Sequence, residues 1–157
     1  MDKTLQSKSP KESQAEVLVR MFPTDANPAG NVFGGEIVKQ IDTIAGIVAQ
    51  RHCQSNAVTA CIDKVNFHKP VFVGDVLILN GRITYVGKTS MEIEVKVESE
   101  NLRTNKITHT HTAFVTMVAL DEKGHPTRIF PLKLETLEEK KQFEQGKLRM
   151  EQRTKAK

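Results

Sequence analysis

Residues 27–42 read Asn27-Pro28-Ala29-Gly30-Asn31-Val32-Phe33-Gly34-Gly35-Glu36-Ile37-Val38-Lys39-Gln40-Ile41-Asp42. Proline and glycine early in this stretch interrupt regular structure, and Asn31 is a residue type that favours the N-terminal cap of a helix. Apolar side chains then recur at the spacing of a helix, with polar side chains on the opposite side. The apolar positions are Ile37, Ile41, Ile44, Ala45 and Val48. We therefore predict a turn-rich loop that leads into an amphipathic helix with one buried face.

The start of this helix is the first candidate site. Gly34 and Gly35 let a ligand approach amide hydrogens that have no partner in the helix, and the helix dipole favours negative charge there. Asp42 falls at the border of the apolar stripe, among small residues. An oxyanion site followed by a carboxylate suits acyl transfer to water. Two simpler interpretations remain: the glycines serve only close packing, or Asp42 is a solvated residue or an ion-pair partner of Lys39.

Composition bounds the class of protein. A chain of 157 residues, 38% hydrophobic and 27% charged, is typical of one soluble domain, and no apolar run is long enough to cross a bilayer. We expect a cytoplasmic protein with no membrane partner. The net charge of +4 arises mostly from Lys147 onward, so no nucleic-acid-binding face is expected. Cys53 and Cys61 are expected to be reduced thiols.

The order of elements indicates the fold. Beyond the helix, residues 91–98 alternate apolar and charged side chains, which is typical of a strand with one buried face. A charged helix is expected at residues 134–150, packing through Leu137, Phe143 and Leu148. Strands are predicted at residues 16–22, 57–62, 64–67, 76–86 (with a bend at Asn80-Gly81), 91–98 and 107–120. This order favours an α+β architecture, an antiparallel sheet wrapped around one long helix. One helix cannot cover both faces of such a sheet, so we expect an oligomer.

Other candidate residues are weaker. His109 and His111 are expected on one side of a strand, as in a two-ligand metal site, but no second ligand pair is visible and no metal is predicted. The adjacent pair His52 and Cys53 diverges on a helix end and forms no triad. Gly87-Lys88-Thr89-Ser90 can hold a phosphate or serve only as a hairpin turn. Arg128 can likewise reach a phosphate or be only a solvated cation.

Five stretches in the same order resemble a known family. They are Asn27 to Gly35, the Asp42 helix, Asn66-Phe67-His68-Lys69-Pro70, Val73-Gly74-Asp75 and Val86-Gly87-Lys88-Thr89-Ser90. Together they resemble the hot dog fold acyl-CoA thioesterases, near the bacterial YciA-type and cytosolic acyl-CoA hydrolase branch, over Glu16 to Pro131. The resemblance implies a sheet wrapped around one central helix, a dimer as minimal unit and a trimer of dimers, hence a hexamer.

The resemblance also implies an activity, the hydrolysis of acyl-CoA to free acid and CoA without metal or organic cofactor. Asp42 would act as general base or nucleophile, and Asn31 would help to place the water or thioester in a site shared with a partner subunit. The amides of Gly34 and Gly35 would stabilise the oxyanion. The pantetheine arm and phosphates would be held by Asn66, Phe67, Gly87, Lys88, Thr89, Ser90 and Arg128.

Three segments are expected: residues 1–12 flexible, 13–131 the hot dog domain and 132–157 a charged C-terminal helix or tail. Two rival functions remain. A hot dog domain can bind acyl-CoA as a sensor without cleaving it, or act as a dehydratase. Dehydratases of this fold usually use a histidine as base, and none lies at a matching place in the loop or helix.

Overall fold

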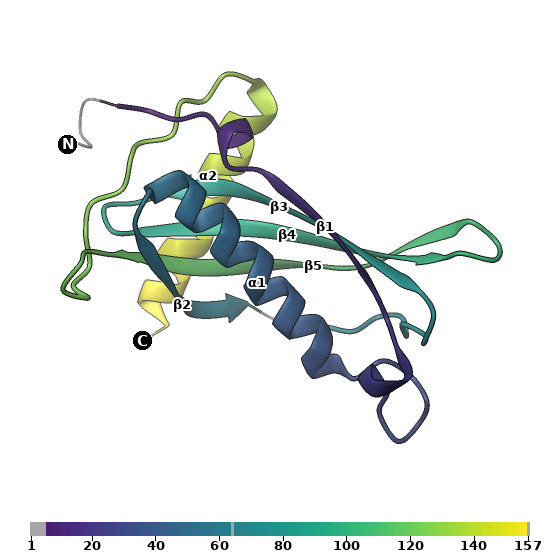
Figure 1. The fold of residues 1–157 in the computed structure, drawn as a ribbon. Helices are drawn as coiled ribbons and strands as arrows, with labels where there is room; N and C mark the ends of the chain where they lie inside the picture. The colour runs from purple at the N-terminus through teal and green to yellow at the C-terminus, as the bar shows by residue number, and fades with distance from the viewer. Residues whose placement is uncertain (1–5, 64, 157) are drawn as a thin grey trace.

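The computed structural model describes residues 6–63 and 65–156. Its strands form one antiparallel sheet in the order β1-β3-β4-β5-β2, and the long helix α1 lies across one face (Figure 1). This arrangement confirms the predicted α+β fold of a sheet around one long helix. The elements are β1 Ala15–Arg20, α1 Gly34–Cys53, β2 Asn56–Asp63, β3 Val76–Val86, β4 Ser90–Asn101, β5 Lys106–Leu120 and α2 Leu137–Lys155, with 3-10 turns at Pro10–Glu12 and Pro23–Asp25.

The core lies between α1 and the sheet. All five apolar helix positions expected from the periodicity are buried, and so are the residues of β4 that face them. Gly81 in β3 lets the helix come close, because a Cβ there would lie 3.1 Å from Val48 and 3.2 Å from Ile44. The pattern of alternation in β4 therefore delivers one row of side chains to α1 and the other row to the opposite face.

The loop before α1 is organised by Asn27 rather than Asn31. The helix begins at Gly34 with Phe33 as N-cap, and no side chain caps it, so the expectation that Asn31 caps the helix is wrong. Asn31 instead forms a β-bridge with Phe72. Asn27 Oδ1 accepts hydrogen bonds from the backbone N–H groups of Ala29 and Asn31, at 2.9 and 3.1 Å, as asparagines in turns do.

Three strand predictions need correction. The irregularity in β3 lies between Ile83 and Tyr85, opposite β4, and not at residues 80–81. Residues 65–67 form no strand, and residue 64 lies outside the described residues. A bulge in β5 opposite Val97 makes His111 buried and His109 exposed, so the two histidines do not share a face.

The second helix covers the outer face of the sheet (Figure 1). Leu137 and Leu148 are 85% and 56% exposed, so the prediction that they pack is wrong for both. The helix packs through Phe143, whose ring lies 4.9 Å from that of Tyr85, and through the buried Gly146. Among the described residues, no helix is both long and apolar enough to cross a membrane.

Part of the segment expected to be flexible is held in place. Lys8 pairs in parallel with Leu132, and its Nζ donates to the carbonyl of Arg51 at 2.7 Å. Pro10 is buried. The backbone of Lys8 bonds to that of Pro131 and Lys133, and Pro10–Glu12 form a 3-10 turn with local hydrogen bonds. Residues 1–5 lie outside the described residues.

Candidate functional site

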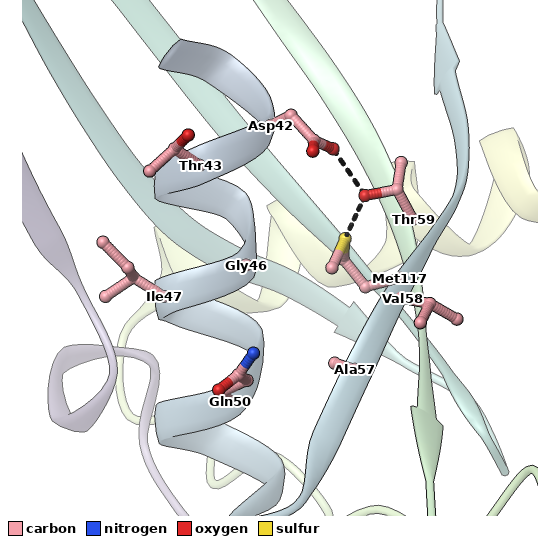
Figure 2. A pocket seen from close by; sticks show the side chains of 9 residues that line it. All are labelled: Asp42, Thr43, Gly46, Ile47, Gln50, Ala57, Val58, Thr59 and Met117. Atoms are coloured by element: carbon pink, nitrogen blue, oxygen red, sulfur yellow. Dashed lines mark hydrogen bonds between the residues drawn. The ribbon is translucent and has the colours of Figure 1, made fainter. Parts of the chain in front are cut away.

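Asp42 and Thr59 meet between α1 and β2 (Figure 2). The Thr59 hydroxyl donates to Asp42 Oδ1 at 2.5 Å, and it also lies 3.3 Å from Met117 Sδ. A hydroxyl has one hydrogen, and a carboxylate is the stronger acceptor, so the hydrogen goes to Asp42. This bond holds the carboxylate in one orientation and leaves Oδ2 available to a ligand.

Thr59 lies on an edge strand, directly before an irregularity in its pairing. β2 is an edge strand, and its pairing with β5 shifts between Thr59 and Cys61. Thr59 and Val58 are both exposed in the single chain. Thr59 was not predicted from the sequence, because no local pattern shows that a strand residue will contact a helix residue 17 positions earlier.

A cavity of about 500 Å³ opens beside this pair. The carboxylate and hydroxyl lie at one end of it, and Gln50 and Ala57 lie at the other (Figure 2). Its lining residues are Asp42, Thr43, Gly46, Ile47, Gln50, Ala57, Val58, Thr59 and Met117. Asp42 can therefore take a proton from a water molecule, or attack a carbonyl carbon, within a space that admits a ligand.

The predicted oxyanion donors lie elsewhere on the helix. Gly34 precedes Asp42 by about two turns, roughly 12 Å at a rise of about 1.5 Å per residue. The ring of Phe67 lies 3.2 Å from where a Cβ of Gly34 would be, and a Cβ on Gly35 would collide with the ring of Phe33. The glycine pair thus permits two aromatic rings to pack on the helix start. Asn31, Asn66 and the two glycines do not line the cavity of Asp42.

The predicted phosphate-binding residues meet in a second cavity. Gly87, Lys88 and Arg128 line a space of about 460 Å³ between the β3–β4 turn, residues 128–134 and α2. The turn is closed by the N–H of Gly87, which donates to the carbonyl of Ser90 at 2.8 Å. Thr89 and Ser90 belong to this turn but do not line the cavity. The two cavities share no lining residue, so one chain alone does not join them.

Known proteins are similar to this chain in sequence. The Thioesterase superfamily matches residues 29–106. An uncharacterized acyl-CoA thioester hydrolase of Bacillus subtilis, YkhA, is 43% identical over 129 residues, which is 82% of this chain and 75% of that protein. The cytosolic acyl coenzyme A thioester hydrolase of Rattus norvegicus is 42% identical over 86% of this chain, but the chain spans only 36% of the length of that relative.

Solved structures show the same fold over nearly the whole chain. An apo-hexameric acyl-CoA thioesterase has a TM-score of 0.91 at 41% identity, covering 96% of this chain and 97% of that one. An acyl-CoA hydrolase from Staphylococcus aureus, solved with butyryl coenzyme A and coenzyme A, has a TM-score of 0.88 at 33% identity, covering 96% and 92%. The chain therefore belongs to the acyl-CoA thioester hydrolases of the thioesterase superfamily, which have the hot dog fold.

Proposed function

We propose that this protein hydrolyses the thioester of an acyl-CoA to a free carboxylic acid and CoA, with Asp42 as general base for water or as nucleophile. The observation that carries the proposal is the Asp42 carboxylate, oriented by Thr59 and open to a cavity between α1 and β2. A carboxylate held in this way needs neither metal nor organic cofactor to activate water. A relative at 42% identity is named cytosolic, which supports a cytoplasmic location for this protein as well.

Variants of the Staphylococcus aureus acyl-CoA hydrolase support the two site residues. Its solved alanine variants replace an aspartate and a threonine that lie 17 residues apart, the separation between Asp42 and Thr59. A third variant, solved with coenzyme A, replaces an asparagine. That asparagine precedes the aspartate by as many residues as Asn27, and not Asn31, precedes Asp42. Asn27 therefore joins Asn31 as a candidate for placing the thioester.

The distance along α1 supports a site built from two subunits. A reacting carbonyl must lie about 3 Å from both the attacking group and the oxyanion donors, whereas Gly34 and Asp42 of one helix are separated by roughly 12 Å. Asp42 of one chain therefore works with Asn31, Gly34 and Gly35 of the partner subunit. Val58 and Ile47, 43% and 37% exposed beside Asp42, lie on the surface that such a partner covers.

Oligomeric relatives fit this arrangement. Two of the similar solved structures are hexameric thioesterases. We therefore propose a dimer as the minimal active unit and a trimer of dimers as the assembly.

The second cavity suits the polar end of CoA. Lys88 and Arg128 place two exposed cations beside backbone N–H groups of a turn, which is the chemistry that binds phosphates. Thr89 and Ser90 add hydroxyl groups in the same turn. Asn66 and Phe67, in the exposed loop after β2, are proposed to contact the pantetheine arm.

Release of free thiol from acyl-CoA by the purified protein tests the proposal. Asp42→Ala is expected to lower the rate at least roughly 100-fold, the scale of a lost general base. Thr59→Ala is expected to lower it less, because the carboxylate remains. Lys39→Ala, an exposed position one turn before Asp42 and outside the cavity, is the matched control and should leave the rate unchanged.

The outcomes separate the rival functions. Equal rates for Asp42→Ala and the wild type would remove Asp42 from the mechanism. Binding of acyl-CoA without thiol release by the wild type would favour the sensor. A dehydratase is disfavoured because, in the part of the chain that the structure describes, no histidine lines the cavity of Asp42.

A further inference from the structure

His111 carries a buried polar atom that the proposed chemistry does not use. The side chain belongs to β5 and is 4% exposed. Its Nδ1 lies 3.2 Å from Thr110 Oγ1, whereas its Nε2 has no hydrogen-bond partner among the described residues. Buried polar atoms nearly always have a partner, so an unpaired one requires an explanation.

The hydrogen bonds around Thr110 decide the tautomer. The Thr110 hydroxyl donates its only hydrogen to the carbonyl of Val97 at 3.0 Å, so towards His111 it acts as acceptor. Nδ1 of His111 therefore carries the ring hydrogen, and Nε2 presents a lone pair. Burial lowers the pKa of His111 below its ordinary value, and the nearby His109 and His68 lower that pKa further, so the ring is neutral at pH 7. The unpaired atom is thus a hydrogen-bond acceptor.

One aromatic ring contacts both His111 and the start of α1. The ring of Phe67 packs edge-on against His111, with centroids 5.4 Å apart, and the same ring covers Gly34. Phe67 is 48% exposed and lies in residues 65–68, which form no helix or strand. The ring that covers the helix start is therefore also the ring that packs against His111. The helix start and the unpaired acceptor are independent observations that point to the same space.

We propose that Nε2 of His111 accepts a hydrogen bond from an amide N–H of the pantetheine arm, in the space that Phe67 fills in the free protein. The inference rests on the proposed function, because the arm follows the thioester sulfur directly and its amides supply the donors that a lone pair requires. With the thioester oxygen at Gly34 and Gly35, the arm would run beneath Phe67. His111 transfers no proton; it is a positioning residue of the subunit that supplies the oxyanion donors.

Paired substrates test this role. The wild type and His111→Leu are compared on an acyl-CoA and on the same acyl thioester of 2-mercaptoethanol, which has no amide. We expect His111→Leu to raise KM for the acyl-CoA about tenfold, the scale of one hydrogen bond, with little change in kcat. The amide-free thioester should show no difference. His111→Gln, which retains an acceptor, should recover most of the affinity.

The controls separate positioning from folding. His109→Leu changes an exposed neighbour that bonds to Thr112, and it should leave both substrates unaffected. Equal losses on the two thioesters for His111→Leu, or a KM for acyl-CoA equal to that of the wild type, would overturn the inference. If the wild type releases no thiol from either substrate, the proposed function fails instead. Calorimetric Kd values for CoA then decide the inference, and equal values for wild type and His111→Leu would overturn it.

Discussion

The two faces of the sheet are built on different principles, although the same strands supply both. Towards α1, β4 presents Met91, Ile93 and Val95, each fully buried against the helix. Towards α2, the same strand presents Glu92, which is also fully buried, yet is paired with two arginines of α2. The face towards α1 is therefore stabilised by burial and close packing of apolar side chains, and the face towards α2 by buried ion pairs.

The ionic face has a defined geometry. Arg149 donates to both oxygens of Glu92, at 2.9 and 2.8 Å, and its guanidinium lies 3.8 Å from the centre of the Phe114 ring. Arg153 bonds to Glu92 and also to Asp63, the last residue of β2. Burial lowers the pKa of Arg153, but the pairing with Asp63 and with Glu92 together outweighs burial and raises that pKa. The C-terminal helix is thereby fastened to the strand that carries Thr59, and both faces of the sheet support the candidate site.

The largest effect is expected on the apolar face. Ile44→Ala removes a side chain that is 1% exposed and that packs on Gly81, so it leaves a cavity. The free energy of unfolding should fall by about 4 kcal/mol. Chemical denaturation measures it. Lys39→Ala, at an exposed position of the same helix outside the cavity, should cost less than about 1 kcal/mol, and equal losses for the two variants would contradict the assigned core face.

A smaller loss is expected on the ionic face. Glu92→Gln removes a buried charge and leaves Arg149 and Arg153 without their shared partner, so unfolding should become easier by about 3 kcal/mol. Glu94→Gln is the matched control, because it lies on the same face of β4 but is paired with a more exposed arginine, Arg82. Its effect should stay below about 1 kcal/mol. A loss for Glu94→Gln as large as that for Glu92→Gln would show that burial of the pair does not matter.

The smallest effect on stability is expected from His52, a polar side chain buried on the otherwise apolar face. His52 of α1 is fully buried, and its Nε2 lies 2.8 Å from the carbonyl of Phe130. Burial has the largest influence and lowers the pKa of His52 below its ordinary value near 6.5. The nearby charge of Lys8 lowers this pKa further, whereas the hydrogen bond to Phe130 and the charge of Glu12 raise it without cancelling the effect of burial. The folded state therefore binds fewer protons than the unfolded state. The stability from neutral His52 is complete above pH 6.5 and is lost as the pH falls below it.

Thermal melts between pH 7.5 and 5 check this sign. The wild type should lose more stability on acidification than His52→Gln, because only the wild type carries this buried imidazole. The difference between the two proteins is the relevant quantity, since carboxylates contribute equally to both. Parallel pH profiles for wild type and variant would show that His52 does not titrate with unfolding.

The sequence predicted the elements well where periodicity is strong. α1 and the long strands lie where the patterns indicate. The resemblance to hot dog thioesterases is confirmed by relatives at about 40% identity. The errors fall where a distant partner decides the local structure. Asn31 pairs with Phe72 instead of capping α1, and Lys8 is held by the chain near Leu132.

By itself the sequence determined the amphipathic helix, the alternation of the strands and the presence of Asp42 beside small residues, because these follow from local spacing. Only the tertiary structure decided which groups meet. Thr59 reaches Asp42 because β2 pairs with the edge of β5 beside α1, and the bulge in β5 puts His111 inside and His109 outside. Both results depend on sheet register, where a shift of one residue reverses the face of every side chain, and no local pattern encodes such a shift.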